Sequence, residues 1–344
     1  MELEKVSYWA EQGREIALAT VIRTWGSSPR PVGSRMAITS QGEITGSVSG
    51  GCVESAVLDL GREVIKEGLP QKTHFGIADE TAWDVGLACG GELDVFIKPV
   101  EKRDLVLWKR VDEVESAFCR VMIVDGPDNV VGRETVITAS GDVVGPDLDV
   151  EGEKEIRHRA LQAIREKESA LEEIPHPTHD QELICFFHVH LPRPTVVAVG
   201  GVHIAIPMMK MAKALKYRTV VIDPRKLFAT PERFPDVDQL LTSWPTQAFD
   251  AIQVDEYTAV AMLTHDPKID DPALQIALTS DAFYVGALGS QKTQADRRER
   301  LLASGLREQY LGRLHAPIGL DLGGRDPEEI AIAVMAEIVQ VLNT

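Results

Sequence analysis

Residues 195–342 alternate short apolar runs with helical stretches, and this alternation restricts the fold more than any other feature of the chain. The apolar runs read TVVAVGG, RTVVID, TAVAMLT and AFYVGAL. Such an order is typical of a parallel sheet whose strands are joined by crossover helices. The sequence therefore predicts an α/β fold class with a C-terminal Rossmann-like doubly wound parallel sheet, which we place in residues 191–344.

The first half of the chain has another pattern, in which β-like runs such as ALATVIRTW, SRMAITS, ELDVFIKPV and CRVMIVDG alternate with glycine-rich turns. A charged segment with helical character, residues 151–173, and the strand-like run ELICFFHVHLPRP follow. We predict an N-terminal mixed α/β domain with Gly-rich hairpins over residues 1–190, including this linking helix and strand. A total of 344 residues suits two domains, and Pro192 and Pro194 mark the boundary.

An internal repeat lies within the first half. VGSRMAITSQGEITG (32–46) aligns without gaps to VGRETVITASGDVVG (131–145), with six identities in fifteen positions. Both copies are predicted to form a β-hairpin with a glycine in the turn. The first copy continues into SVSGGCVESAV, whereas the second continues without a Gly-Gly pair or a cysteine. The Gly-Gly-Cys turn is thus an addition to one copy, which favours a functional role, although chance similarity of two hairpins is the alternative.

The turn SGGC contains Gly50, Gly51 and Cys52, and apolar residues recur at helical spacing after it. Cys52 is therefore expected in or just before the first turn of a helix. Unpaired amides and the positive dipole end at that place stabilise a thiolate or a bound anion. The alternative is a small buried hydrophobic residue, the usual state of a free cysteine. The adjacent glycine pair favours a functional role for Cys52.

A second glycine-cysteine turn, LACGGELDVFIKPV, places Cys89 and Gly90 just before a strand-like run. The same two interpretations apply to Cys89, and the adjacent glycines again favour a functional role. A zinc site is disfavoured, because no pair of ligands has the spacing of a zinc finger.

Before the first of these turns, TWGSSPRPVGSR offers Arg30 and Arg35 among several hydroxyl groups. Two interpretations are equally favoured: a loop that binds a phosphate group, and a proline-rich hairpin loop whose arginines are solvated. In the run FFHVHLP, His188 and His190 fall on one face of the expected strand. Two side chains are too few for a metal site, so we interpret both histidines as structural.

The loop VVAVGGVHIAIP follows a strand and opens a helix, as the first turn of a dinucleotide-binding fold does. Gly200 keeps the first glycine of the G-x-G-x-x-G pattern and Ala205 stands at an allowed third position, but Val202 replaces the second glycine. Asp223 ends the next strand near the usual ribose-binding offset. Because the backbone must approach the pyrophosphate closely at the second glycine, binding of NAD(P) is doubtful.

Polar residues also follow the other strands of the second half. They are His203, His265, Asp266, Ser290 and His315. In an open α/β sheet the carboxyl ends of the strands surround the ligand crevice. We therefore expect these residues near that edge, with the three histidines in a shared pocket.

The chain is acidic, with a formal net charge of −17 and a pI near 5.0. This charge argues against general binding to nucleic acid and against adhesion to anionic membranes. The first residues, MELEKVSYWAEQ, lack the features of a signal peptide, and the apolar runs are shorter than the roughly 20 residues that span a bilayer. The four cysteines form no CxxC pair, so we expect reduced thiols in a cytoplasmic protein.

Several long phrases resemble the xanthine dehydrogenase accessory factor family, XdhC/CoxI. They are ATVIRTWGSSPRPVGSRMAITSQGEITGSVSGGCVESAV, AWDVGLACGGELDVFIKP, VIDPRKLFATPERFP, LTHDPKIDDPAL, YVGALGSQKT and HAPIGLDLGGRDPEEIA. The likeness covers both halves in order. It implies a maturation chaperone for molybdenum hydroxylases, more a non-catalytic factor than an enzyme, and not itself a xanthine dehydrogenase.

The resemblance implies that the chain binds molybdenum cofactor (molybdopterin) transiently, supports its sulfuration and inserts it into a xanthine dehydrogenase-type apo-enzyme. Implied partners are that molybdenum hydroxylase, a cysteine-desulfurase-type sulfur donor and further copies of the chain, with no nucleic acid or membrane. Where the family has GAGHIA this chain has GGVHIA, which adds to the doubt about NAD(P).

In this interpretation the Cys52 sulfur contacts the molybdenum, since a soft thiolate suits that metal, and Gly50 and Gly51 let the backbone approach. Cys89 is the second expected sulfur. Two rival functions are an NAD(P)-dependent oxidoreductase built on the second half and a cofactor-free protein-docking module. Against the reductase, no tyrosine has a lysine four residues later.

Overall fold

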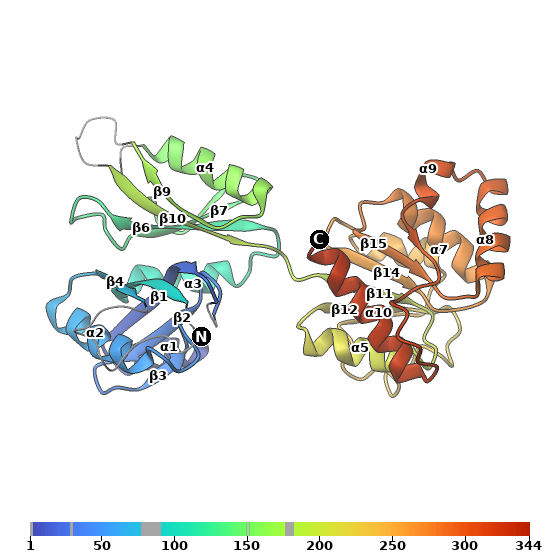
Figure 1. Cartoon of the computed structure of the whole chain (residues 1–344), viewed down its shortest axis with the longest axis horizontal. Helices are drawn as coiled ribbons and strands as arrows, with labels where there is room; N and C mark the ends of the chain where they lie inside the picture. The colour runs from blue at the N-terminus through green and yellow to red at the C-terminus, as the bar shows by residue number, and fades with distance from the viewer. Residues whose placement is uncertain (1–2, 28–29, 77–90, 149, 151, 176–181) are drawn as a thin grey trace. The chain divides into compact units, whose positions relative to one another are not determined.

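The structure is a computed structural model that describes residues 3–27, 30–76, 91–148, 150, 152–175 and 182–344 (Figure 1). The chain divides into two compact units, Met1–Pro192 and Arg193–Thr344. In the described residues, no helix is long and apolar enough to cross a membrane.

In its described residues, the first unit contains two five-stranded sheets, with strand orders β3-β2-β1-β5-β4 and β8-β7-β6-β10-β9. The elements of its first half are α1 (Leu3–Glu11), β1 (Ile16–Trp25), β2 (Arg35–Thr39), β3 (Ile44–Gly46), α2 (Glu54–Glu67), β4 (Gln71–Phe75) and β5 (Glu92–Pro99). Those of its second half are α3 (Lys102–Val111), β6 (Phe118–Asp125), β7 (Glu134–Thr138), β8 (Val143–Val144), α4 (Glu153–Glu166), β9 (Ala170–Ile174) and β10 (Leu183–His190).

The two halves of the first unit repeat each other element by element, as α-β-β-β-α-β-β. Their strand registers also agree, because β1 skips Ile22 in its pairing with β5 and β6 skips Val124 in its pairing with β10. Helices α2 and α4 both have 14 residues and start at Glu54 and Glu153, which are separated by the same interval as the two hairpins. The repeat seen in residues 32–46 and 131–145 is therefore part of a duplication of the whole unit.

The first unit is layered, with its two sheets packed face to face and a helix on each outer surface (Figure 1). α2 buries Val57 and Val64 against one sheet, and Gly61 permits a close approach, since an added Cβ would lie 2.5 Å from Ile38 Cδ1. α4 covers the other sheet in the same way. Between the sheets lies an apolar cluster of Ile22, Phe96, Met122, Val124 and Phe186.

The second unit is an all-parallel, six-stranded sheet in the order β13-β12-β11-β14-β15-β16. Numbered within the unit, this is 3-2-1-4-5-6, the Rossmann order, so the predicted fold class is confirmed. Its elements are β11 (Thr195–Val199), α5 (Ala205–Ala214), β12 (Arg218–Ile222), β13 (Gln239–Leu241), α6 (Pro245–Ala248), β14 (Thr258–Met262), α7 (Pro267–Thr279), β15 (Tyr284–Ala287), α8 (Gln291–Ala303), α9 (Glu308–Leu311), β16 (Leu314–His315) and α10 (Pro327–Leu342).

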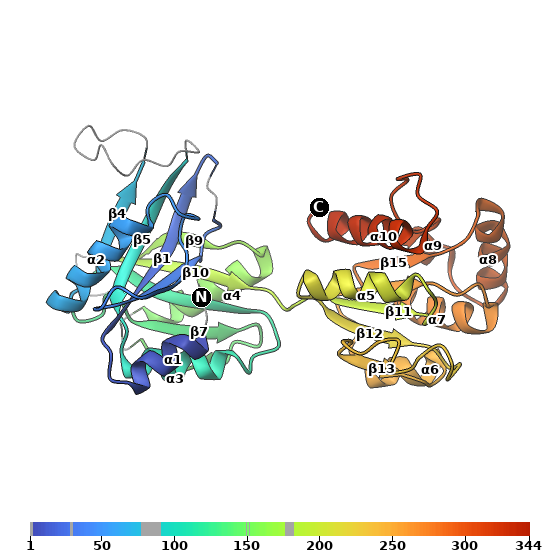
Figure 2. The same cartoon turned by 90° about the horizontal axis from the view of Figure 1, so that it is seen from below.

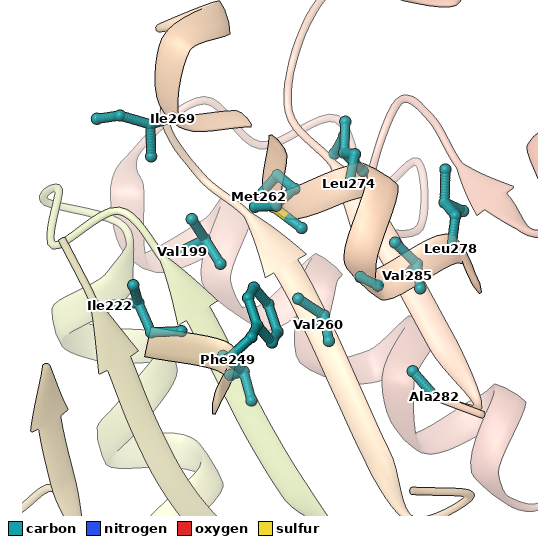
Figure 3. Close-up of a cluster of buried hydrophobic side chains, with 14 of the residues drawn as sticks. Val199, Ile222, Phe249, Val260, Met262, Ile269, Leu274, Leu278, Ala282 and Val285 are labelled. Atoms are coloured by element: carbon teal, nitrogen blue, oxygen red, sulfur yellow. The ribbon is translucent and has the colours of Figure 1, made fainter. Parts of the chain in front are cut away.

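Helices cover both faces of this sheet. α5 and α10 lie side by side on one face (Figure 2). On the other face, Val199, Ile222, Val260 and Met262 point toward Phe249 and toward α7 (Figure 3). The strands are buried on both sides, which explains why their sequences are continuous apolar runs without polar alternation.

One element of the sequence prediction was wrong. The charged helix expected over residues 151–173 ends at Glu166, where Lys167 adopts φ +58°, and residues Ala170–Ile174 form strand β9. β9 pairs with β10 at the edge of its sheet, so the pairing overrides the helix propensity of ALEEI. Charged residues on an edge strand stay in solvent, which makes such a strand resemble a helix surface in sequence.

Candidate functional site

The turn before α2 is organised around the carboxylate of Glu54. Its Oε1 accepts hydrogen bonds from Ser47 Oγ at 2.6 Å, Ser49 N at 2.9 Å and Gly50 N at 3.0 Å. Its Oε2 accepts from Ser49 Oγ and, at 2.8 Å, from Gly51 N. The amides that the sequence analysis assigned to an external anion therefore surround an anion that belongs to the chain.

The chemistry of Glu54 agrees with this geometry. Burial alone would raise its pKa, but the hydrogen bonds from Ser47 and Ser49 outweigh burial and lower the pKa to about 2. Gly50 and Gly51 have φ of +79° and +122°, in the region that favours glycine, so the pair is required by the backbone of the turn. Sequence reasoning missed Glu54; its signal was an acidic residue in the first helical turn, three residues after the second glycine of the pair.

We expect Glu54→Ala to destabilise the first unit by about 1–2 kcal/mol, because several hydrogen bonds to one carboxylate are lost at a partly exposed site. The matched control is Glu153→Ala, since the equivalent Glu153 accepts a hydrogen bond from Leu148 N at 3.2 Å, without the shell of donors that surrounds Glu54 in the described part of the chain. Urea unfolding at pH 7 measures both. Equal effects of the two variants would contradict the special role of Glu54.

The same stabilisation should depend on pH. The pKa of Glu54 is lower in the folded chain than the ordinary 4.5, so the stabilisation is complete above that value and is lost as the pH falls toward 2. The difference between wild type and Glu54→Ala should therefore shrink at low pH.

Cys52 stands out among the three cysteines that the structure describes. It is partly exposed, two residues before the first residue of α2. Cys119 and Cys185 are fully buried in the core between α4 and its sheet, and burial raises the pKa of each thiol to about 12. Cys89 and Gly90 lie outside the described residues. Within the described part of the chain, Cys52 is thus the thiol that a ligand can reach.

A cavity of about 330 Å³ opens beside this turn. Arg30 and Arg35, which the sequence analysis selected for a phosphate, both line it, and Ser47 belongs both to the cavity wall and to the shell around Glu54. The remaining lining residues are Leu3, Gly33, Ser34, Gly46, Arg120, His188 and His190.

Two arginines of the cavity wall, Arg35 and Arg120, belong to a cluster of charged residues. Glu134, fully buried, accepts from Arg35 Nη2 at 2.7 Å and from Arg120 Nη1 at 2.8 Å, and Lys98 Nζ lies 3.7 Å from its other oxygen. Lys98 also pairs with Asp104 at 2.7 Å. Burial alone would raise the pKa of Glu134, but the adjacent Arg35 and Arg120 hold it well below its usual range. Glu134 is therefore a carboxylate at pH 7.

His188 and His190 were interpreted as structural, and this interpretation missed their position in the cavity wall. His190 stacks on Phe118 with ring centroids 4.5 Å apart, and the two histidine rings are 4.1 Å apart. Burial, with nearby Arg120 and Arg35, lowers the pKa of His190 to about 3, so its ring is neutral at pH 7. The sequence feature that indicates this position is the F-x-H-x-H alternation, which places both histidines on the same face of β10 as the buried Phe186.

In the second unit, Gly200 and Gly201 are required by contacts within the protein. An added Cβ would lie 2.4 Å from Thr264 Cγ2 at Gly200 and 2.4 Å from the Phe228 carbonyl oxygen at Gly201. Asp223 is fully buried and both of its oxygens are used. Oδ1 accepts from Arg225 N and Nε, and Oδ2 accepts from Gly201 N and Arg225 Nη2, at 2.7 to 2.9 Å.

The polar residues selected at the strand ends have separate surroundings. His203 and His265 are exposed, while Asp266 and Ser290 cap α7 and α8 by accepting from Lys268 N and Thr293 N. His315 bonds through Nδ1 to Glu337 at 3.1 Å and packs against Tyr284. The shared pocket of the three histidines stays a prediction.

Each of the two units contains a segment that matches a known protein family. Residues 196–338 match the protein family described as the XdhC Rossmann domain, and residues 9–76 match the XdhC and CoxI family. A protein of Bacillus subtilis that is named as a probable subunit of xanthine dehydrogenase is 27% identical over 96% of this chain and 94% of its own length. The molybdenum cofactor insertion chaperone PaoD of Escherichia coli is 25% identical over 96% of this chain and 84% of its own length.

A solved structure has a similar fold. The crystal structure of a protein described as a xanthine dehydrogenase from Bacillus halodurans superimposes with a TM-score of 0.73. The match covers 99% of this chain and 95% of the other, at 24% sequence identity. The fold of this chain is therefore one that a solved protein adopts.

Proposed function

Because this chain belongs to the XdhC and CoxI family, we propose that it is an accessory chaperone that binds molybdenum cofactor and inserts it into a xanthine dehydrogenase-type apo-enzyme. Its likeness to the insertion chaperone PaoD supports this role. The proposal includes support for sulfuration of the cofactor, with a cysteine-desulfurase-type enzyme as the donor of sulfur. The chain would act as a carrier of the cofactor without catalysing hydroxylation.

One observation carries the proposal more than any other: the Cys52 thiol is partly exposed in a turn whose backbone is fixed by Glu54. Molybdenum in this cofactor is held by sulfur, and a soft thiolate is a suitable additional ligand. A fixed loop presents its thiol without a large loss of conformational entropy on binding. Cys52 would contact the metal end, and Glu54 would hold the turn in place.

The proposal is tested by incubating the full-length protein with molybdenum cofactor under anaerobic conditions and then desalting it. We expect close to one molybdenum per chain to remain with the protein and to appear in its absorbance spectrum. An unrelated acidic protein treated in the same way controls for non-specific retention of the cofactor. A molybdenum content equal to that of this control would reject the proposal and favour a cofactor-free docking module.

We further propose that the second unit does not bind NAD or NADP tightly. In a dinucleotide-binding fold the acidic residue after the second strand accepts a bond from a ribose hydroxyl, but both oxygens of Asp223 are occupied by Gly201 and Arg225. Val202 is half-buried against the apolar cluster beside α5, so its side chain is a smaller obstacle than the sequence analysis assumed.

Titration calorimetry of the wild-type protein with NAD and NADP is expected to show little binding up to millimolar concentrations. Arg225→Ala should increase the affinity more than Val202→Gly, because it removes the two guanidinium hydrogen bonds to Asp223 and leaves its carboxylate with the two bonds from backbone amides. Tight binding by the wild type would contradict this account and revive the oxidoreductase alternative.

A further inference from the structure

The cavity has a counterpart in the duplicated architecture of the first unit. Lys98 pairs with Leu18 in one sheet as His188 pairs with Arg120 in the other, so Lys98 and His188 occupy equivalent positions. By the same duplication, Gly132 is equivalent to Gly33 and Glu134 to Arg35. The first unit therefore contains two places that are equivalent in its duplicated fold, one beside Gly132 and one beside Gly33.

The place beside Gly132 is filled by Lys98. Its Nζ donates to the Gly132 carbonyl oxygen and to Asp104, both at 2.7 Å, and the side chain is almost fully buried. A cation with a paired carboxylate and a carbonyl acceptor has its hydrogen bonds satisfied by the protein. Lys98 and Asp104 therefore form a structural ion pair beside Gly132.

The place beside Gly33 is different, because the shorter side chain of His188 stands where Lys98 stands in the counterpart. The His188 ring lies close against Gly33, where an added Cβ would be 2.0 Å from its Nε2. His188 also lines the cavity of about 330 Å³. A volume of this size is at the lower end of the range for small-molecule sites.

The charge of this cavity favours an anion. Its described lining residues include Arg30, Arg35 and Arg120 and contain no carboxylate. Arg35 and Arg120, together with the buried Lys98, face two buried carboxylates, Glu134 and Asp104, which leaves an excess of one positive charge. Burying charge without compensation is costly, so an anion in the cavity would be stabilising.

Buried nitrogen atoms that lack a hydrogen-bond partner in the described residues also favour a bound anion. Arg120 Nε, His188 Nδ1 and His190 Nε2 are buried and lack a partner within the described residues. Arg120 is 7% exposed. Buried nitrogen atoms of this kind are seldom left without an acceptor, and all three belong to residues of the cavity wall.

We propose that this cavity is a binding site for the phosphate group of a small-molecule phosphate monoester. Arg30, Arg35 and Arg120 supply the positive charge, because guanidinium groups match the geometry of phosphate oxygens. The neutral rings of His188 and His190 can each donate one hydrogen bond. The inference stands without the proposed function, and it deepens that function if the phosphate is the one on the cofactor's pterin.

The test uses the full-length protein and two probes, inorganic phosphate and glycerol 3-phosphate, titrated calorimetrically at constant ionic strength. We expect saturable binding with one site per chain. Arg30→Gln and His190→Phe should each weaken it about tenfold or more, because each removes a hydrogen bond to a charged ligand. His190→Phe keeps the ring that stacks on Phe118, so folding should be preserved.

The matched controls are Arg110→Gln and His158→Phe, which change exposed residues of α3 and α4 away from the cavity lining. Binding should be unchanged in both. Absence of saturable binding by the wild type would overturn the inference, as would equal affinity in the cavity variants and the controls.

A second measurement identifies the source of the phosphate. Retention of molybdenum cofactor that falls in His190→Phe together with phosphate affinity would support the cofactor's phosphate as the occupant. Retention that persists while phosphate affinity falls would support the site and assign it to another phosphate monoester. Phosphate binding is measured without cofactor, so failure of this inference and failure of the chaperone proposal give different results.

Discussion

Glu134→Gln is expected to destabilise the first unit by about 3–5 kcal/mol, because it leaves a buried cluster of cations without its central carboxylate. Glu134 is fully buried and accepts from both Arg35 and Arg120, with Lys98 beside its second oxygen. Glutamine has the same shape but no charge, so the loss reports electrostatics and not packing. Denaturant unfolding at pH 7, followed by tryptophan fluorescence, measures it.

The matched control is Glu43→Gln, which removes a carboxylate paired with Arg14 at the surface. Exposed pairs contribute about 0–1 kcal/mol, so this variant should remain close to wild type. The pKa of Glu134 is well below 4.5 in the folded chain, so its stabilisation is present above that pH and is lost as the pH falls further. A Glu134→Gln protein as stable as Glu43→Gln at pH 7 would contradict this account of the cluster.

The second unit could be predicted from sequence because its strands are buried on both faces and its helices follow them in order. Continuous apolar runs such as TVVAV and TAVAM have few alternatives. The two edge strands, β13 and β16, have three and two residues, too short to show any periodicity.

The duplication of the first unit was visible only in part. The hairpins share glycines at equivalent turns, such as Gly42 and Gly141, both with positive φ, so their sequences stayed similar. The other repeated elements need only apolar residues on one face, and many sequences meet that need. Lys98 and His188 are equivalent in the fold but differ in length and shape, so their equivalence is visible only from the strand registers.

The candidate site was predicted at its loops and missed at its strands. Arg30, Arg35 and Cys52 lie beside glycine turns, which sequence analysis recognises. Arg120 lies inside the apolar strand β6 and Glu134 begins the apolar strand β7, where a charge is informative only when its partner in the fold is known. The Glu54 carboxylate was overlooked because an acidic residue in the first turn of a helix has an ordinary explanation.

Cys52→Ser is expected to reduce retention of molybdenum cofactor at least tenfold, because a hydroxyl is a harder and poorer ligand for molybdenum than a thiolate. Folding should be nearly unchanged, since the residue is partly exposed and serine is close in size. The bonds from Gly50 and Gly51 to Glu54 should hold the turn in place in the variant. Molybdenum per chain after desalting measures the effect.

The control is Cys119→Ala, which removes a thiol that is fully buried in the core between α4 and its sheet. This substitution should lower the stability somewhat but leave the retention of molybdenum cofactor unchanged, because a ligand cannot contact the buried Cys119 thiol. Equal retention by Cys52→Ser and wild type would show that the Gly-Gly-Cys turn is only a bend.

Transfer of cofactor to a client tests the central claim most directly. Wild-type protein loaded with molybdenum cofactor and freed of excess would be mixed with a xanthine dehydrogenase-type apo-enzyme, and hydroxylase activity measured against time. We predict that activity appears and that molybdenum moves to the hydroxylase in proportion, faster than with the same amount of free cofactor. Activity no greater than with free cofactor, with molybdenum left on the carrier, would contradict the proposed function.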